Sequence, residues 1–326
     1  MGPLFTLADV EAALPIVRAS VPATPQYAWP QLRTRTGVEV IVKHENHTPT
    51  GAFKVRGGLV YFDRLRRERP EVRGVVTATR GNHGQSFAYA GRQSGVPVAV
   101  VVPHGNSVEK NAAMRAFGAE LIEHGRDFDE AKERAEQIAA ERGYEYGPSL
   151  HRDLIIGVAT YALELLTAAA DLDTVYVPIG LGSGICAMIG MRDALGLKTR
   201  IVGVVAQRAN AYRLSFDAGA VVTTNSALTF ADGMAVRVPD GQALAVIRRG
   251  AERIVEVGED EIAEAIRVLF SDTHTLAEGA GAGALAALIK EREWLRDRRV
   301  AVIVTGQNID RPVMRTVLDG GTPQVG

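Results

Sequence analysis

The stretch Thr174-Val175-Tyr176-Val177-Pro178-Ile179-Gly180-Leu181-Gly182-Ser183-Gly184 joins an apolar run directly to a loop rich in glycine. Continuous apolar runs of this length are typical of parallel strands that are buried on both faces. An apolar segment with helical character follows the loop. The order of strand, glycine loop and helix predicts an α/β unit, with the loop at the carboxyl end of a strand, where open α/β sheets bind ligands.

The same alternation of short strands and longer helices extends over most of the chain. The other runs rich in β-branched residues predict strands at 38–42, 74–78, 96–102, 119–122, 200–205 and 300–304. Amphipathic segments predict helices at 85–94, 108–117, 128–142, 157–170 and 260–270. Asp127 and Asp260 are the expected starting residues of two of these helices. We therefore expect an α/β protein whose length suits two domains, with mostly parallel sheets flanked by helices.

The composition excludes several classes of protein. The chain has 326 residues, with 37 Lys and Arg against 38 Asp and Glu, which argues against a nucleic-acid-binding protein. Its one cysteine, Cys186, excludes an internal disulfide and a multi-cysteine zinc site. The N-terminal residues do not form a signal-peptide pattern, and no apolar run is long enough to span a bilayer. We expect a cytoplasmic protein that does not contact membranes.

The loop from Gly180 to Gly184 has two interpretations. It is either a simple turn or a phosphate cradle, in which small residues bring backbone N–H groups and a helix N-terminus close to an anion. A nicotinamide-binding site is disfavoured, because the next predicted strand ends in Val205-Ala206-Gln207 without the expected acidic residue. A Walker loop is excluded because no Lys-Ser or Lys-Thr pair follows.

Lys54 follows the segment Thr50-Gly51-Ala52-Phe53, whose small residues permit close packing against a flat group. A lysine is usually a solvated surface charge, but in an apolar pocket its pKa falls and it becomes a Schiff-base nucleophile. An aldehyde cofactor that carries a phosphate would connect Lys54 with the loop at 180–184. Pyridoxal 5'-phosphate is such a cofactor.

With these motifs in hand, the chain from about Thr24 to Asp310 resembles the fold-type II pyridoxal-phosphate enzymes, specifically the serine/threonine dehydratase and serine racemase family. The motifs that carry the resemblance are Glu45 to Gly57, Gly81 to Gln85, Gly180 to Gly184, Ala231 to Gly233, Ala277 to Gly281 and Thr305. The resemblance implies a fold like that of the tryptophan synthase β chain. A small domain at 55–148 would be inserted into a large cofactor-binding domain formed by 1–54 and 149–326.

The resemblance also implies roles for single residues. Lys54 would carry the cofactor and act as the catalytic base, Asn82 would bond the cofactor's ring oxygen, and Thr305 would contact its pyridine nitrogen. The implied cofactor-binding residues are Phe53, Lys54, Asn82, Gly180, Leu181, Gly182, Ser183, Gly184, Gly233, Glu278 and Thr305. The implied substrate-binding residues are Thr50, Thr79, Arg80, Gly81, Asn82 and His83. Ordinary packing, turn or capping roles stay open for Phe53, Asn82, His83 and Thr305.

The implied reaction is the dehydration and deamination of a β-hydroxy amino acid, such as threonine or serine, to a 2-oxo acid and ammonia. A β-replacement synthase of the cysteine-synthase type, a serine racemase and a cofactor-binding protein without turnover stay open as alternatives. The substrates 3-hydroxyaspartate, phenylserine and amino acids derived from hydroxyectoine also remain candidates.

Three departures from the family refine these expectations. Arg80 stands where racemases have a serine, and arginine is a poor proton donor, so we expect little racemisation. It would instead bind an anionic group of the substrate or pair with an acid of the protein. Racemase-like members bind a divalent cation through a carboxylate in the segment that matches 207–212, which has no acid here, so we expect no magnesium site of that type; a monovalent cation held by carbonyl groups stays open. The chain ends 16 residues after Asp310, so we expect no C-terminal regulatory domain.

The family is commonly dimeric, so the resemblance implies a homodimer.

Overall fold

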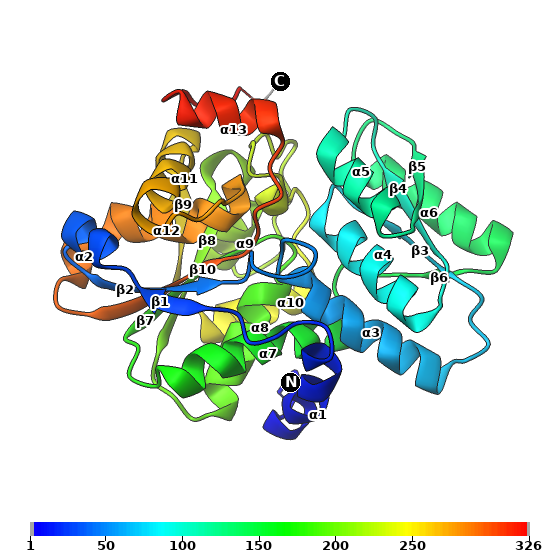
Figure 1. Cartoon of the computed structure of the whole chain (residues 1–326), viewed down its shortest axis with the longest axis horizontal. Helices are drawn as coiled ribbons and strands as arrows, with labels where there is room; N and C mark the ends of the chain where they lie inside the picture. Colours follow the sequence, from blue (N-terminus) through cyan, green and yellow to red (C-terminus); the bar gives the residue numbers. More distant parts are fainter. Residues whose placement is uncertain (1–2, 325–326) are drawn as a thin grey trace.

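The computed structural model describes residues 3–324, which form two sheets surrounded by helices (Figure 1). The strands are β1 (Gln26–Ala28), β2 (Glu39–His44), β3 (Val75–Ala78), β4 (Val98–Val102), β5 (Glu120–Glu123), β6 (Glu145–Tyr146), β7 (Thr174–Pro178), β8 (Arg200–Ala206), β9 (Arg253–Val257) and β10 (Arg299–Val304). The α-helices are α1 (Leu7–Arg18), α2 (Pro30–Thr36), α3 (Lys54–Glu68), α4 (Asn82–Ser94), α5 (Val108–Ala116), α6 (Phe128–Arg142), α7 (Arg152–Ala168), α8 (Ser183–Ala194), α9 (Ala211–Ala218), α10 (Gly241–Gly250), α11 (Glu259–Thr273), α12 (Gly279–Glu291) and α13 (Arg311–Leu318).

The larger sheet has six strands in the order β1-β2-β10-β7-β8-β9. All neighbouring pairs are parallel except the edge strand β1, which runs antiparallel to β2. Successive side chains of a strand point to opposite faces, and β10 shows this directly. Val300 and Val302 belong to the hydrophobic cluster with α11 and α12, whereas Ala301 and Ile303 belong to the one with α7 and α8. Helices on both faces thus explain why these strands are apolar throughout.

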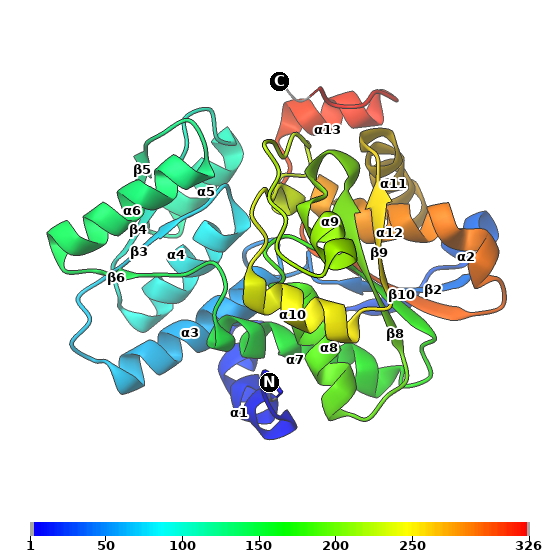
Figure 2. The same ribbon diagram turned by 180° about the vertical axis from the view of Figure 1, so that it is seen from behind.

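The smaller sheet has four parallel strands in the order β5-β4-β3-β6. These strands and the helices α4, α5 and α6 come from one continuous segment, 75–146, which we call the small-sheet unit. The remaining elements form the large-sheet unit, and α3 packs against both α4 and α7. Figure 2 shows the segment between α9 and α10 on the side of the large-sheet unit that faces the small-sheet unit. There Arg237 pairs with Asp129 of α6.

The observed architecture confirms the predicted α/β class. All seven predicted strands are present, and Asp127 caps α6 by accepting the N–H groups of Asp129 and Glu130. The expected start at Asp260 is wrong. Helix α11 begins at Glu259 because Gly258 is the N-cap, and its N–H donates to the carboxylate of Glu261 at 2.7 Å.

Several elements were not predicted. Strands β1, β6 and β9 and helices α1, α2, α3, α9, α10, α12 and α13 were missed. Among residues 3–324, no helix combines the length and the apolar character that crossing a membrane requires.

Candidate active site

Lys54 is the first residue of α3, and the loop before it is fastened to the carboxyl end of β10. The Phe53 N–H donates to the carbonyl oxygen of Thr305 at 3.0 Å, and Ala52 pairs with Gly306 as an isolated β-bridge. The Lys54 Nζ lies 4.8 Å from the centroid of the Phe53 ring. The loop therefore holds the amine beside the edge where the parallel strands of the larger sheet end.

The surroundings of Lys54 make its amine reactive. Burial lowers the pKa of Lys54 to about 8, although the negative charge of Glu278 acts in the opposite direction. At pH 7, about one molecule in ten then carries a neutral amine, compared with fewer than about one in a thousand for a free lysine. A neutral amine is the form that attacks an aldehyde or accepts a proton.

Directly behind Lys54, α3 is anchored by a buried group of charged side chains. The Arg56 side chain is fully buried, and its guanidinium donates to Glu45 at 2.8 and 3.0 Å and to Glu164 at 2.9 and 3.1 Å. The buried Lys43 also pairs with Glu164, at 2.7 Å. We call Lys43, Glu45, Arg56 and Glu164 the inner charge cluster. It ties α3 to β2 and α7, and so fixes the position from which Lys54 projects.

Asn82, the first residue of α4, is held from two sides. Its Nδ2 donates to Glu278 Oε1 at 2.6 Å, and its Oδ1 accepts a hydrogen bond from Asn308 Nδ2 at 2.9 Å. A side-chain amide has two N–H donors, so one donor of Asn82 is still available. These partners determine which way the amide faces.

The loop from Gly180 to Gly184 has the geometry of an anion cradle. A Cβ at Gly180 would lie 2.4 Å from the carbonyl oxygen of Gly233, so no other residue fits there. Gly182 has a φ of +104°, which favours glycine, and Ser183 begins α8. Within residues 3–324, the backbone N–H groups of 180–184 donate no hydrogen bond to any segment other than α8. Free N–H groups at a helix N-terminus are what a phosphate requires.

Thr305 and Gly306 bring the remaining segments to the same place. Thr305 is buried at the end of β10, and its hydroxyl makes no hydrogen bond with any other residue of 3–324. The Glu278 N–H donates to the Gly306 carbonyl at 3.0 Å, and a Cβ at Gly306 would lie 2.4 Å from Glu278 Oε1. The segment at 277–281 therefore meets the end of β10 in close contact.

The predicted substrate-binding residues lie in and around the turn between β3 and α4. Thr79 shapes this turn, since its hydroxyl accepts the Gly81 N–H at 2.9 Å. Arg80 is exposed and makes no ion pair within residues 3–324. Thr50 is buried, and its hydroxyl donates to the Ala52 carbonyl at 3.3 Å. Asn308, which also binds Asn82, ties Thr50 to this turn by donating to its carbonyl at 2.8 Å.

His83 is buried rather than presented to a ligand. Its ring lies 4.2 Å from that of Phe87, centroid to centroid, and its Nε2 lies 3.1 Å from the Thr77 hydroxyl. Burial, together with the smaller effect of the charge of Lys54, lowers the pKa of His83 to about 3, so the ring is neutral. The His83 side chain packs against Phe87, and its contact with substrate stays a prediction; the His83 backbone N–H at the start of α4 also suits a substrate carboxylate.

Two charged residues that are not among the predicted site residues, Lys110 and Asp232, complete the site. The Lys110 Nζ of α5 lies 2.5 Å from Asp232 Oδ2 and 3.2 Å from Glu278 Oε2. Burial alone would lower the pKa of Lys110, but the two carboxylates raise it above its ordinary value. Burial raises the pKa of Glu278, and Lys110 opposes this only in part. Nothing local in the sequence marks Lys110, because its partners lie more than 120 residues away.

Together these groups fit pyridoxal phosphate. An amine of low pKa suits the aldehyde, the spare Asn82 N–H suits the ring oxygen, the free Thr305 hydroxyl suits the ring nitrogen, and the cradle at 180–184 suits the phosphate. The segments of Lys54, Asn82 and Thr305 meet around Glu278 and Gly306, and the loop at 180–184 lies against Gly233 and Phe53. The assignment of each residue to one part of the cofactor remains a prediction.

The fold and this set of groups define a pyridoxal-phosphate-dependent enzyme. Residues 17–306 match the family described as "Pyridoxal-phosphate dependent enzyme", and the chain belongs to this family. Within it, the chain is a fold-type II enzyme of the serine/threonine dehydratase group. The predicted family and cofactor are thereby confirmed.

Three comparisons illustrate the relationship. The chain is 35% identical to L-threonine ammonia-lyase of Geobacter sulfurreducens over 293 residues, which cover 90% of this chain and 73% of that protein. It is 29% identical to L-threo-3-hydroxyaspartate ammonia-lyase of Saccharomyces cerevisiae, with 97% of both chains covered. The processed form of threonine deaminase isoform 2 from Solanum lycopersicum superposes with a TM-score of 0.87 and 27% identity, covering 98% of this chain and 95% of that one.

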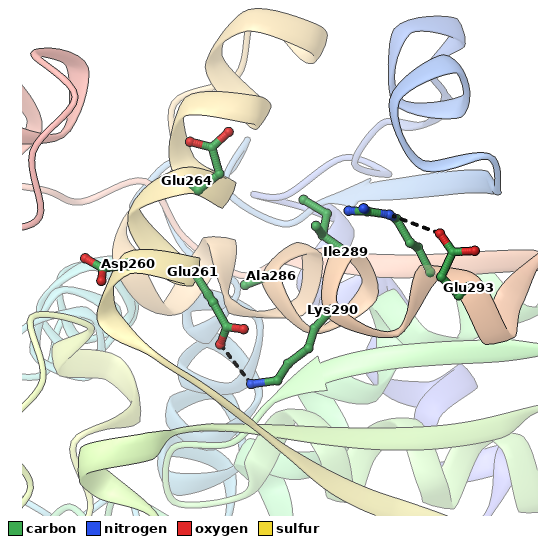
Figure 3. Close-up of a pocket in the computed structure, with 8 residues that line it drawn as sticks. Asp260, Glu261, Glu264, Ala286, Ile289, Lys290 and Glu293 are labelled. Carbon is green, nitrogen blue, oxygen red and sulfur yellow. Dashed lines mark hydrogen bonds and ion pairs between the residues drawn. The ribbon is translucent and has the colours of Figure 1, made fainter.

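A surface cavity of about 440 Å³ lies elsewhere, between α11 and α12 (Figure 3). Its lining includes Glu264 and an ion pair between Glu261 and Lys290, with a distance of 3.0 Å. Glu278 precedes the first residue of α12, whereas Lys290 is near its end, so about 18 Å of helix separates this cavity from the active site. The cavity contributes nothing to the site around Lys54.

Proposed function

We propose that this chain is an ammonia-lyase that converts a β-hydroxy amino acid, such as threonine or serine, to a 2-oxo acid and ammonia. The observation that carries the proposal is the buried Lys54, whose pKa is lowered to about 8 beside an anion cradle and an oriented Asn82. The similarity to named ammonia-lyases supports the same reaction class.

In this proposal, pyridoxal phosphate supplies the electron sink that stabilises negative charge at the substrate's α-carbon. The Lys54 Nζ removes the α-proton, because a neutral amine within the site is a suitable general base. The N–H groups of the turn at 79–83 hold the substrate carboxylate beside the N-terminus of α4. Thr305 offers a neutral hydroxyl, which cannot protonate a ring nitrogen as an acid would, and this favours elimination over a long-lived carbanion.

The test is a panel of β-hydroxy amino acids scored for release of 2-oxo acid, with and without an added thiol. We expect release without thiol. A product that forms only with thiol would instead support a β-replacement synthase, and release of D-amino acid without oxo acid would support a racemase. Borohydride should trap the cofactor on Lys54 and not on a Lys54→Ala variant; a protein that binds no cofactor would refute the proposal.

We further propose that Arg80 binds an anionic group of the substrate, which makes 3-hydroxyaspartate a preferred member of the panel. Arg80 is exposed, lies two residues before Asn82, and pairs with no acid among residues 3–324. The alternative of a protein salt bridge therefore has no support in the described chain. A planar guanidinium binds a carboxylate through two parallel hydrogen bonds, which gives selectivity as well as affinity.

The same proposal includes the cellular location, the oligomeric state and the domain boundaries. We place the protein in the cytoplasm, expect a homodimer, and set the domain boundaries at 54/55 and 148/149. The small-sheet unit at 75–146 lies entirely between these boundaries, which supports the division; α3 after Lys54 also lies between them and packs against both units. Size-exclusion chromatography with light scattering tests the dimer, and a monomeric mass across the concentration range would refute it.

A further inference from the structure

Helix α5 carries a row of polar contacts from the small-sheet unit to the large-sheet unit. The Ser107 hydroxyl, which caps α5, donates to Asp310 Oδ1 at 2.5 Å. The Glu109 carboxylate accepts the backbone N–H of Arg311 at 2.9 Å. Lys110 lies on the same first turn and pairs with Asp232 and Glu278. The N-terminal turn of α5 thus docks against the active site, and Lys110 is its charged contact there.

The charges at this contact depend on one another. Asp232 and Glu278 both belong to the large-sheet unit, and both lie within ion-pair distance of the same Lys110 nitrogen. Lys110 is 5% exposed and Glu278 is 3% exposed, so water screens neither charge well. Glu278 Oε2 accepts no hydrogen bond from residues 3–324, and the ion pair with Lys110 is its compensation in the described chain.

Glu278 transmits this contact to Asn82. One of its oxygens faces Lys110 while the other accepts the Asn82 Nδ2 at 2.6 Å. A carboxylate that has lost its proton accepts hydrogen bonds only, so it fixes the amide of Asn82 with the nitrogen toward Glu278. A protonated carboxyl group donates as well, and the amide would no longer have a single preferred orientation.

We infer that Lys110 is a positioning residue: docking of α5 brings its ammonium group to Glu278, and Glu278 then holds the Asn82 amide in the orientation that binds the cofactor. The inference deepens the proposed function and rests on it for the role of Asn82. The close approach of Lys110 also explains why position 81 is glycine, since a Cβ there would lie 2.5 Å from Lys110 Cδ.

The test compares K110M with K110R, D232N and the double variant K110M/D232N. K132M is the matched control, because Lys132 belongs to α6 of the same unit and its side chain is 47% exposed. Hydrogen exchange of the protein without cofactor is followed in peptides covering 81–85 and 278–283. Affinity for pyridoxal phosphate is measured by absorbance, and thermal unfolding shows that each variant is folded.

We expect K110M to increase exchange in both peptides and to weaken cofactor affinity, each by at least about tenfold, with K132M unchanged. K110R should recover most of both losses. K110M/D232N should recover part of them, because removal of the Asp232 charge relieves the repulsion that Glu278 feels without Lys110. This rescue separates a charge effect from a packing effect.

Changes of less than twofold in K110M would overturn the inference, and so would a double variant no better than K110M. If K110M does not fold, K110Q replaces it under the same criteria, because it keeps a donor without the charge. Exchange and cofactor affinity need no turnover. A wild-type protein that releases no oxo acid would therefore refute the proposed function while these measurements still decide the role of Lys110.

Discussion

The inner charge cluster makes a strong prediction about stability. In an R56M variant, the fully buried guanidinium is replaced by an apolar side chain of similar length, and Glu45 and Glu164 stay behind in a buried site. Glu164 keeps its partners Lys43 and Arg18, whereas Glu45 keeps, among residues 3–324, only the Thr24 hydroxyl, at 2.5 Å. Removal of one partner from a buried ion pair costs about 3–5 kcal/mol. At about 2 °C per kcal/mol for a chain of this size, the unfolding midpoint should fall by roughly 6–10 °C.

The same helix provides the control. Arg67 of α3 pairs with Asp63 one turn earlier, but the two side chains are 60% and 34% exposed. An exposed pair of this kind contributes about 0.2–1 kcal/mol, so R67M should lower the midpoint by no more than about 2 °C. Thermal unfolding followed by circular dichroism measures both variants without cofactor. If R56M is no less stable than R67M, the buried pairs around Arg56 do not anchor α3, and the reasoning fails.

Three further predictions concern the active site. The first concerns the rate at which the protein without cofactor captures pyridoxal phosphate. Because only the neutral amine reacts, this rate should rise about tenfold per pH unit below the Lys54 pKa of about 8 and level off above it. A rate that levels off only near pH 10.5 would contradict the argument that burial lowers the pKa of Lys54. G180A should weaken cofactor affinity at least about tenfold, because the added methyl group would collide with Gly233. G241A is the control and should leave the affinity unchanged, since a Cβ at Gly241 would lie 3.9 Å from the nearest atom. Equal affinities of the two variants in stopped-flow titration would argue against the cradle. Arg80→Ala should lower kcat/KM for 3-hydroxyaspartate about 10- to 100-fold and leave serine within threefold, and an unchanged ranking of substrates would remove Arg80 from substrate recognition.

The sequence predicted those parts of the fold that depend on local pattern. Strands buried on both faces, such as β7 and β8, are recognisable because their residues are apolar or β-branched, except Arg200 at the start of β8. The edge strand β1 and the two-residue β6 have no such pattern, since neither is buried throughout. Helix α12 was not predicted because it begins with Gly279-Ala280-Gly281-Ala282-Gly283, and glycine disfavours a helix by local propensity. Gly279 and Gly281 are needed there because they pack closely against the backbone of Ala231 and Gly306.

The candidate site divides in the same way. Lys54, Asn82 and the glycine loop stand in short motifs whose chemistry can be argued locally. Lys110 gave no local signal, because a single lysine on an amphipathic helix is typical of a solvated face, and only the tertiary fold brings it to Asp232 and Glu278. Asn308 acts through Asn82, which lies 226 positions earlier in the chain. Contacts of that range depend on how the two units dock, and one sequence does not contain that information.

The inner charge cluster and the group formed by Lys110, Asp232 and Glu278 should respond differently when one member is removed. The inner charge cluster draws its members from β2, α3 and α7, which pack together, so loss of Arg56 should appear as loss of global stability. The pairs of Lys110 join two units across the active site, so the repulsion between Asp232 and Glu278 in K110M should first loosen the contact between the units rather than unfold either of them. K110M should therefore change local exchange and cofactor affinity at a nearly unchanged unfolding midpoint, whereas R56M should lower the midpoint first. A comparison of these two variants separates residues that build the site from residues that complete it when the units dock.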